Sequence, residues 1–295
     1  MMFATASGFL VESSLEDSSL SARPYPTSLI VHPRFPFGAK HFLHPSRLLR
    51  SSVSLGVPGI PFELVVRQRQ SSKTGDGTGF SVWRGSTLLA AFLAKHHRYS
   101  SGSAIELGCG SGAIVSAVAA FCGFDAHATD GCPEVVEDAR QSITEHRVAA
   151  LRAGQSLRGR LSCGALEWRP DLAKRLNRRF DLVLGSEVVY ALPTDSQDTI
   201  TANFKNLAAT IDILLKPYGL CVLAWNPRTD AEHNFFRIIR DFNLVASKPH
   251  ALDGLGLTAD QTGGLRLVTL SRPRTITTTE EGSDHHRSTQ THLKN

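Results

Sequence analysis

Glu106, Gly108, Gly110 and Gly112 stand together in the stretch AIELGCGSGAIV (104–115), between an apolar run and a helical pattern. A glycine-rich turn between a strand and a helix lets the backbone approach a nucleotide, and its N–H groups and the helix dipole favour polar or anionic ligand groups. The stretch therefore predicts a loop that holds an adenosine-bearing cofactor.

Two cofactor classes use such a loop. Gly108, Gly110 and Ala113 satisfy the dinucleotide pattern G-x-G-x-x-G/A, and Asp130, twenty residues after Gly110, is placed to bind a ribose diol. Glu106 favours the other class, because a carboxylate near the loop repels a pyrophosphate but attracts an ammonium group. S-adenosylmethionine carries an ammonium and no phosphate. A plain strand-to-helix turn, in which Glu106 caps backbone amides, is the third interpretation.

The elements that must position this loop alternate between short apolar runs and helical patterns, as in βα units with a mainly parallel sheet. We expect strands at 104–107, 125–130, 160–168, 180–188 and 218–225, and helices near 111–122, 133–146, 196–215 and 231–242. Two later strands, NLVAS and GLRLVTL, would form a closing antiparallel hairpin. The predicted fold is α/β: a Rossmann-like, seven-stranded, mainly parallel sheet with helices on both faces.

The ends of the chain differ from this core in composition. Residues 1–40 are rich in Ser and Pro without a sustained period, and residues 272–295 are polar almost throughout. We expect an irregular N-terminal extension (1–40), a folded domain with a short N-terminal subsegment (41–271) and a disordered tail (272–295).

Composition limits the class of protein. The 295 residues carry 32 basic and 27 acidic side chains, a formal charge of +5. The basic residues are mixed along the sequence as on a solvated face, and an acidic protein or a nucleic acid as partner is the alternative. The five cysteines form no C-x-x-C pair, which favours free thiols in a reducing compartment. We expect a cytoplasmic chain, with the nucleus as the alternative, no membrane segment, no metal and a monomeric state.

Four stretches carry a resemblance to a known family. They are TGFSVWRGSTLLAAFL (78–93), ELGCGSG with the following ATD, LEW (166–168) and VLGSEVVY (183–190). Together they resemble the class I (seven-strand) S-adenosylmethionine-dependent methyltransferases of family 16, the group that includes the METTL21-type protein-lysine methyltransferases. The resemblance runs from about residue 60 to 271, and it implies a protein substrate that presents a lysine.

The resemblance also implies a set of cofactor contacts. Asp130 would bind the ribose hydroxyls and Trp168 would lie beside the adenine. The implied cofactor-binding residues are Trp83, Glu106, Gly108, Cys109, Gly110, Asp130, Trp168 and Ser186.

The substrate side departs from the family's pattern. The family has D-x-x-Y after the fourth strand, where this chain has Glu187-Val188-Val189-Tyr190. We expect Tyr190 to form a wall of the lysine channel and Glu187 to orient the amine, as the two catalytic residues. The alternative for Tyr190 is that it only ends a core strand.

Other functions stay open at this point. A nucleic-acid amino methyltransferase is disfavoured because SEVVY lacks the proline-shaped (N/D/S)-P-P-(Y/F) loop, and a small-molecule methyltransferase or a non-catalytic interaction module on the same fold are further alternatives. Cys109 has no accompanying base for nucleophilic chemistry, and Ser186 lacks the second glycine of G-x-S-x-G. Arg228 and Phe235 would lie at the rim of the substrate mouth. The alternative for Phe235 is that it only packs its helix.

Overall fold

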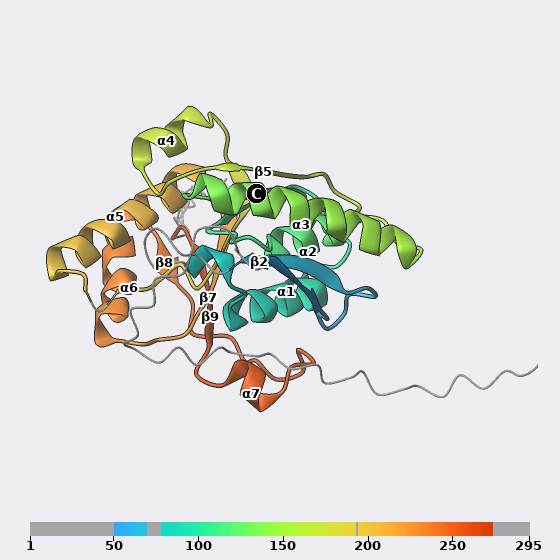
Figure 1. Ribbon diagram of the computed structural model, residues 1–295. Coiled ribbons are helices and arrows are strands. Elements are labelled where there is room, and N and C mark those ends of the chain that lie inside the picture. Colours follow the sequence, from blue (N-terminus) through green and yellow to red (C-terminus); the bar gives the residue numbers. More distant parts are fainter. Residues whose placement is uncertain (1–49, 70–77, 193, 274–295) are drawn as a thin grey trace, which may run out of the picture. The chain divides into compact units, whose positions relative to one another are not determined.

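A computed structural model describes residues 50–69, 78–192 and 194–273 (Figure 1). All of these belong to one of two compact units, Pro45–Asn295. The expected extension (1–40) and nearly all of the expected tail (272–295) lie outside the described residues. The domain boundaries therefore stay predictions.

Seven strands form one sheet in the order β5-β4-β3-β6-β7-β9-β8. The first five strands in this order pair in parallel with their neighbours, and β9 pairs antiparallel with both β7 and β8. The expected mainly parallel sheet with a closing antiparallel pair is confirmed. The strands are β3 (Ser103–Leu107), β4 (Asp125–Asp130), β5 (Leu161–Ala165), β6 (Phe180–Ser186), β7 (Leu215–Trp225), β8 (Val245–Ala246) and β9 (Arg266–Ser271).

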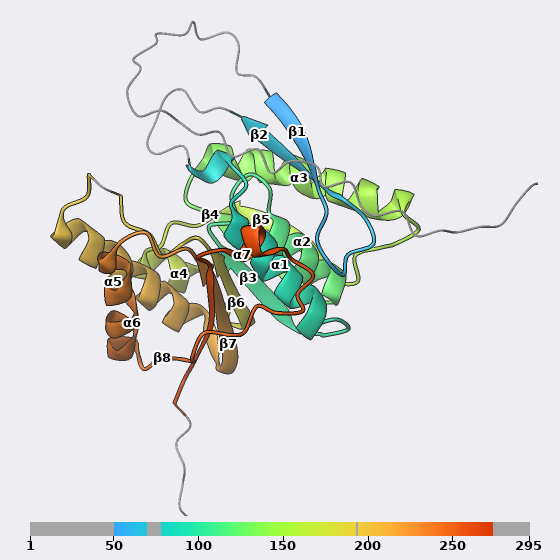
Figure 2. The same cartoon turned by 90° about the horizontal axis from the view of Figure 1, so that it is seen from below.

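Helices cover both faces of the sheet (Figure 2). One hydrophobic core lies between the sheet and the helices α1 (Arg84–His96), α2 (Ile114–Cys122) and α3 (Pro133–Arg152). A second core lies on the other face, under α4 (Pro170–Arg175), α5 (Gln197–Leu214) and α6 (Phe235–Ile238). The short helix α7 (Ala259–Thr262) precedes β9.

The alternation of side chains along β3 explains where Glu106 points. Ala104 belongs to the core under α1–α3, whereas Ile105 and Leu107 belong to the core under α4–α6. Because successive side chains of a strand face opposite sides of the sheet, Glu106 shares the face of Ala104. Its carboxylate is therefore directed toward α2.

Several elements differ from the sequence expectation. Helix α2 begins at Ile114 rather than 111, because Ala113 before it adopts a left-handed φ of 45°. The single helix expected over 231–242 is divided into a 3₁₀ turn (Asp230–Asn234), α6 and a second 3₁₀ turn (Ile239–Phe242). An antiparallel hairpin, β1 (Arg50–Leu55) with β2 (Leu64–Arg69), was not expected at all.

The hairpin adds to the core beside α3. Leu64 and Val66 of β2 are buried in the same core as α1–α3, and the Arg67 amide donates a hydrogen bond of 3.1 Å to Ser142 Oγ of α3. Among the described helices, none is both long and apolar enough to cross a membrane.

Candidate functional site

The glycine loop follows β3 at the carboxyl edge of the parallel strands, where open α/β sheets bind ligands. Gly108 and Gly110 have positive φ values of 69° and 60°, which side chains with a Cβ rarely adopt. A Cβ on Gly108 would lie 2.9 Å from Val188 Cγ1 and 3.3 Å from Trp168 Cζ2. The loop thus brings Trp168, from the β5 exit, and the segment after β6 to one place.

The amide groups of the loop already have protein acceptors. Cys109 N donates to the Thr129 carbonyl at 2.8 Å, Gly110 N to Asp130 Oδ2 at 3.1 Å and Ser111 N to the Gly79 carbonyl at 2.8 Å. A pyrophosphate cradle needs such amides to be directed at the phosphate oxygens. This loop fits a cofactor without phosphate better than a dinucleotide.

Asp130 ends β4 beside the loop, as the spacing predicted. Its Oδ2 accepts from Gly110 N and its Oδ1 accepts from Cys132 N at 3.1 Å, so the half-buried carboxylate is oriented by the backbone on both sides. A carboxylate fixed in this way at the end of the second parallel strand is suited to a ribose diol.

Glu106 is buried, with 1% of its surface exposed, and Oε2 accepts from both Ser116 N (2.8 Å) and Ser116 Oγ (2.6 Å). These are the contacts of the capping interpretation. Burial raises the pKa of Glu106 to about 8, although the Ser116 hydrogen bonds act in the opposite direction. Near neutral pH this carboxyl is therefore mostly protonated.

Cys109 and Ser186 lie at the same edge of the sheet. Cys109 is 8% exposed, and burial, with the nearby Glu106 and Asp130 charges, raises the pKa of its thiol well above the ordinary value. A thiol in that state is a poor nucleophile. Ser186 is half-buried at the last position of β6, opposite Ala224 of β7.

A second cluster lies where β6 and β7 end. Glu187 has a left-handed φ of 57°, its amide donates to the Ala224 carbonyl at 2.7 Å, and its side chain is 6% exposed. Non-glycine residues in this conformation are strained and concentrate at functional sites. A Cβ on Gly85 would lie 2.8 Å from Glu187 Cγ, so the glycine at the start of α1 makes room for this side chain.

Arg228 is the partner of Glu187. The Nη2 of Arg228 donates to Glu187 Oε2 at 2.7 Å, and the same oxygen accepts from Asn226 N at 3.2 Å. The guanidinium of Arg228 lies 5.1 Å from the centre of the Trp83 ring. Trp83 therefore contacts Arg228 at the β7 exit, a contact that the sequence did not predict. A carboxylate and an indole face together form a site for a cation.

Glu232 was missed by the sequence analysis. It is fully buried, and its Oε2 accepts from Arg228 N at 2.8 Å. Burial raises the pKa of Glu232, whereas hydrogen bonds from the backbone of Arg228 and Ala191 act in the opposite direction. It thus connects the β7 exit to the segment that follows Tyr190. The only signal in the sequence was the spacing of four residues between Arg228 and Glu232.

Tyr190 is half-buried four residues beyond the end of β6, directly after the buried pair Val188 and Val189. Phe235 is fully buried and packs edge-to-face against Phe204 at 5.8 Å and Phe236 at 5.3 Å. The packing alternative for Phe235 is confirmed. Within the described ranges, no group of three or more His, Cys, Asp or Glu is arranged to hold a metal ion.

The chain is similar to known methyltransferases. Residues 66–242 match the model of a family described as lysine methyltransferase (Methyltransf_16). A curated fission yeast relative, protein-lysine N-methyltransferase rrg1, is 28% identical over 60% of this chain and 55% of its own. The mouse protein-lysine methyltransferase METTL21E is 26% identical over 65% of this chain and 76% of its own.

Among solved structures, that of SMU.776, described as a putative methyltransferase complexed with SAH, superposes with a TM-score of 0.50. It is 14% identical, and the match covers 74% of this chain and 55% of that one. The likeness supports the fold. The chain spans little more than half the length of the fission yeast relative, so the match to that relative is partial.

Proposed function

The chain belongs to the lysine methyltransferase family that it matches over residues 66–242, with S-adenosylmethionine as its cofactor, and we propose that it methylates a lysine side chain of a protein. The observation that carries the proposal is the pairing of two sites at one edge of the sheet. A loop suited to a phosphate-free cofactor lies next to a carboxylate and an indole that hold a cation.

The cofactor side of the proposal assigns roles to the residues around the glycine loop. Asp130 binds the ribose hydroxyls, because its carboxylate is fixed at the end of β4. Trp168, whose ring edge approaches Gly108, lies beside the adenine. Trp83, Glu106, Gly108, Cys109, Gly110 and Ser186 complete the proposed cofactor-binding set.

The substrate side must present an unprotonated amine. A free lysine has a pKa near 10.4, so its ammonium must lose a proton to water before the neutral amine attacks, and burial beside an aromatic ring favours this by lowering the pKa of the lysine. The bound cofactor supplies an electrophilic methyl group on its sulfonium. We assign Tyr190 to the wall of the lysine channel and Glu187 to orienting the amine, because both follow β6 next to Val188, which contacts the glycine loop position.

Arg228 occupies the place of a cation in this site. Its guanidinium pairs with the Glu187 carboxylate and faces Trp83, the two groups that would bind a lysine ammonium, and its side chain is 34% exposed. A partly exposed ion pair is weak enough to exchange. The entering lysine would therefore displace Arg228 from Glu187.

The decisive experiment is a calorimetric titration of the purified chain with S-adenosylmethionine, with NAD in parallel. The expected result is micromolar binding of S-adenosylmethionine alone. Tritium transfer from labelled cofactor into cell lysate, followed by hydrolysis and amino-acid analysis, should then give methyl-lysine in a protein.

Other results favour the alternatives. Tritium label in nucleic acid or in small molecules would mean that one of these, and not a protein, is the methyl acceptor. Cofactor binding without methyl transfer would favour an interaction module. Binding of NAD alone would overturn the assignment of the cofactor.

We also propose a reducing compartment, the cytoplasm or the nucleus, and a monomeric state. All five cysteines, which lie in the described part of the chain, are free thiols. This supports a reducing environment.

A further inference from the structure

The amino edge of the sheet, opposite the candidate site, carries a basic groove. One hollow of about 600 Å³ is lined by Arg147, Arg160 and Arg178 together with His127 and Ser162, and a second of about 470 Å³ is lined by Arg178, Arg179 and Lys216. The two hollows share Asp125 and Arg178 and therefore adjoin each other at these residues. Hereafter "the basic groove" means this pair of hollows with the adjoining Arg158.

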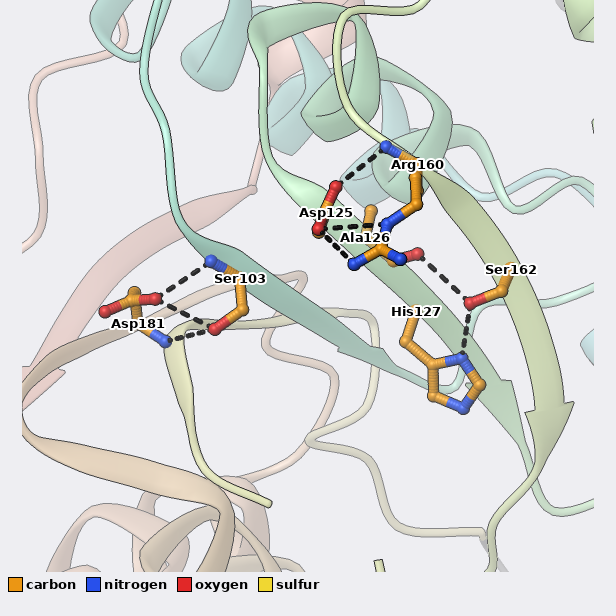
Figure 3. Close-up of polar contacts among 7 residues, drawn as sticks. All are labelled: Ser103, Asp125, Ala126, His127, Arg160, Ser162 and Asp181. Atoms are coloured by element: carbon orange, nitrogen blue, oxygen red, sulfur yellow. Dashed lines mark hydrogen bonds and ion pairs between the residues drawn. The ribbon is translucent and has the colours of Figure 1, made fainter.

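The acidic residues of the groove are already paired. Asp125 accepts from Arg160 N, Nε and Nη2, and Asp181 accepts from Ser103 and from Lys216 Nζ at 2.8 Å. Figure 3 shows Asp125 enclosed by Arg160, and Asp181 bound to Ser103 across the neighbouring strands.

The remaining cations have no such partner. Arg147 donates to the Leu161 carbonyl and Arg179 to the carbonyls of Asp212 and Leu215, which leaves both charges uncompensated. Arg158 and Arg178 lie over aromatic rings, those of Tyr99 and Phe180. Within the described ranges, none of these four arginines forms an ion pair with a carboxylate.

The dimensions of the groove fit an extended polyanion rather than one phosphate. Apart from Arg147, which lies in α3, the basic residues precede or begin β5, β6 and β7, and the strands from β5 to β7 stand in the order β5-β4-β3-β6-β7. Four strand spacings of about 4.8 Å give a length of roughly 19 Å. Several successive phosphates of one strand span that length.

One exposed aromatic ring beside the groove, that of Tyr99, favours a nucleic acid over an acidic peptide; Tyr99 lines neither hollow, but it contacts Arg158, which stands between the lining residues Leu157 and Gly159. Tyr99 is 71% exposed, and the Arg158 guanidinium lies 4.0 Å from the centre of its ring. The hydrogen bond from Arg158 and the charges of Arg98 and Arg158 lower the pKa of Tyr99. An exposed ring beside a row of arginines can stack a base while the arginines bind the backbone of a single strand, and arginine is the preferred partner of phosphate.

We propose that the basic groove binds a single-stranded nucleic-acid backbone, as a docking site separate from the methyl-transfer site. The nucleic acid is a ligand here and not the methyl acceptor. The inference stands independently of the proposed function, because the groove lies at the other end of the strands.

The test measures fluorescence anisotropy of a labelled 12-nucleotide oligouridylate with the full chain. Neutralising about three phosphates gives a slope near −2 of log affinity against log salt, a loss of roughly 20-fold between 50 and 200 mM salt. The double variant Arg158→Ser/Arg178→Ser should weaken binding about tenfold or more and reduce the slope to about −0.7.

The matched control is Arg175→Ser/Arg240→Ser, which removes the same charge from two exposed arginines that line neither hollow. It should change the affinity less than about twofold, and both double variants should bind S-adenosylmethionine as the parent does. An equal loss in the control would mean nonspecific attraction to a chain of +5, and overturns the proposal.

Two other results also overturn it. No binding at 50 mM salt removes the site, and equal or tighter binding of a labelled twelve-residue oligoglutamate assigns the groove to an acidic protein segment. Should the groove variant fail to bind the cofactor, Tyr99→Ser gives the answer, because loss of an exposed ring should weaken oligouridylate binding without changing the salt slope. Unchanged affinity in that variant contradicts the proposal.

Discussion

The two halves of the carboxyl edge of the sheet are held by different forces. On the cofactor side, the glycine loop is fixed by backbone amides that donate to Thr129, Asp130 and Gly79. On the substrate side, the exits of β6 and β7 are joined by a charged pair, Glu187 with Arg228, over a strained backbone. The backbone of the first half is already hydrogen-bonded without a ligand, whereas the second contains a cation, Arg228, that the proposed lysine substrate would replace.

The largest effect should come from breaking the cofactor half at Asp130. Asp130→Ala removes the proposed hydrogen bonds to the ribose and the acceptor of Gly110 N. Hydrogen bonds to a charged group contribute about 1.5–3 kcal/mol each, so the Kd for S-adenosylmethionine should rise about a hundredfold or more in a calorimetric titration.

The control for Asp130 is the residue at the other end of the same strand. Asp125→Ala breaks the surface pair with Arg160 and should leave the isotherm as it was. An unchanged isotherm for Asp130→Ala would remove that residue from the ribose role.

The next effect should change turnover on the substrate side without changing the affinity for the cofactor. Tyr190→Ala should spare cofactor affinity and lower kcat by a factor of roughly 10 to 100, because the wall that positions the amine is lost. The measurement is tritium transfer to the acceptor recovered from lysate. Tyr218→Ala, at a tyrosine that is 97% exposed, is the control. Normal turnover of Tyr190→Ala would mean that Tyr190 only ends a core strand.

The difference between the halves also explains what the sequence could predict. The E-x-G-x-G-x-G spacing and Asp130 are local patterns, and the structure brings their backbones together through neighbouring parallel strands. The pairing of Glu187 with Arg228 joins residues 41 apart in sequence, through a left-handed residue that no propensity predicts at a glutamate. Side-chain pairing across loops depends on tertiary geometry, which periodicity does not encode.

The same distinction holds for the fold. The parallel strands were predicted because short runs with apolar residues alternate with helical patterns along the chain. The β1–β2 hairpin was missed, since RSSVSL and LVVRQR carry weak alternation and are joined by a loop with two prolines. Because Ala113 adopts a positive φ, α2 begins only at Ile114, and an alanine in the sequence does not predict that conformation.

A smaller effect should show whether Arg228 competes with the substrate lysine for Glu187 or instead positions Glu187. If Arg228 occupies the place of the substrate lysine, Arg228→Gln should lower KM for the acceptor by about tenfold with an unchanged cofactor Kd, since a partly exposed ion pair and a cation–π contact together contribute about 1.4 kcal/mol. Arg228→Lys keeps the cation and should leave KM near the parent value. A higher KM with lower kcat in Arg228→Gln would show instead that Arg228 positions Glu187.

The smallest effect concerns Glu106, which should make the binding of the cofactor depend on pH. Its pKa is raised to about 8 by burial, so near pH 7 about nine tenths of the carboxyls are protonated. Pairing with the cofactor ammonium requires the charged form. Binding should therefore release close to one proton, and the affinity should rise about eightfold from pH 6.5 to 7.5.

Calorimetry in phosphate and in Tris buffer counts these protons, because the two buffers differ in ionisation enthalpy. Glu106→Gln keeps an acceptor for Ser116 and should bind the cofactor with no proton release and little pH dependence. If the parent chain also releases no proton, Glu106 stays protonated against Ser116 and only caps α2. The cofactor half would then use Asp130 alone as its charged group, and the resemblance at Glu106 would reflect the architecture of the loop rather than a contact with the ligand.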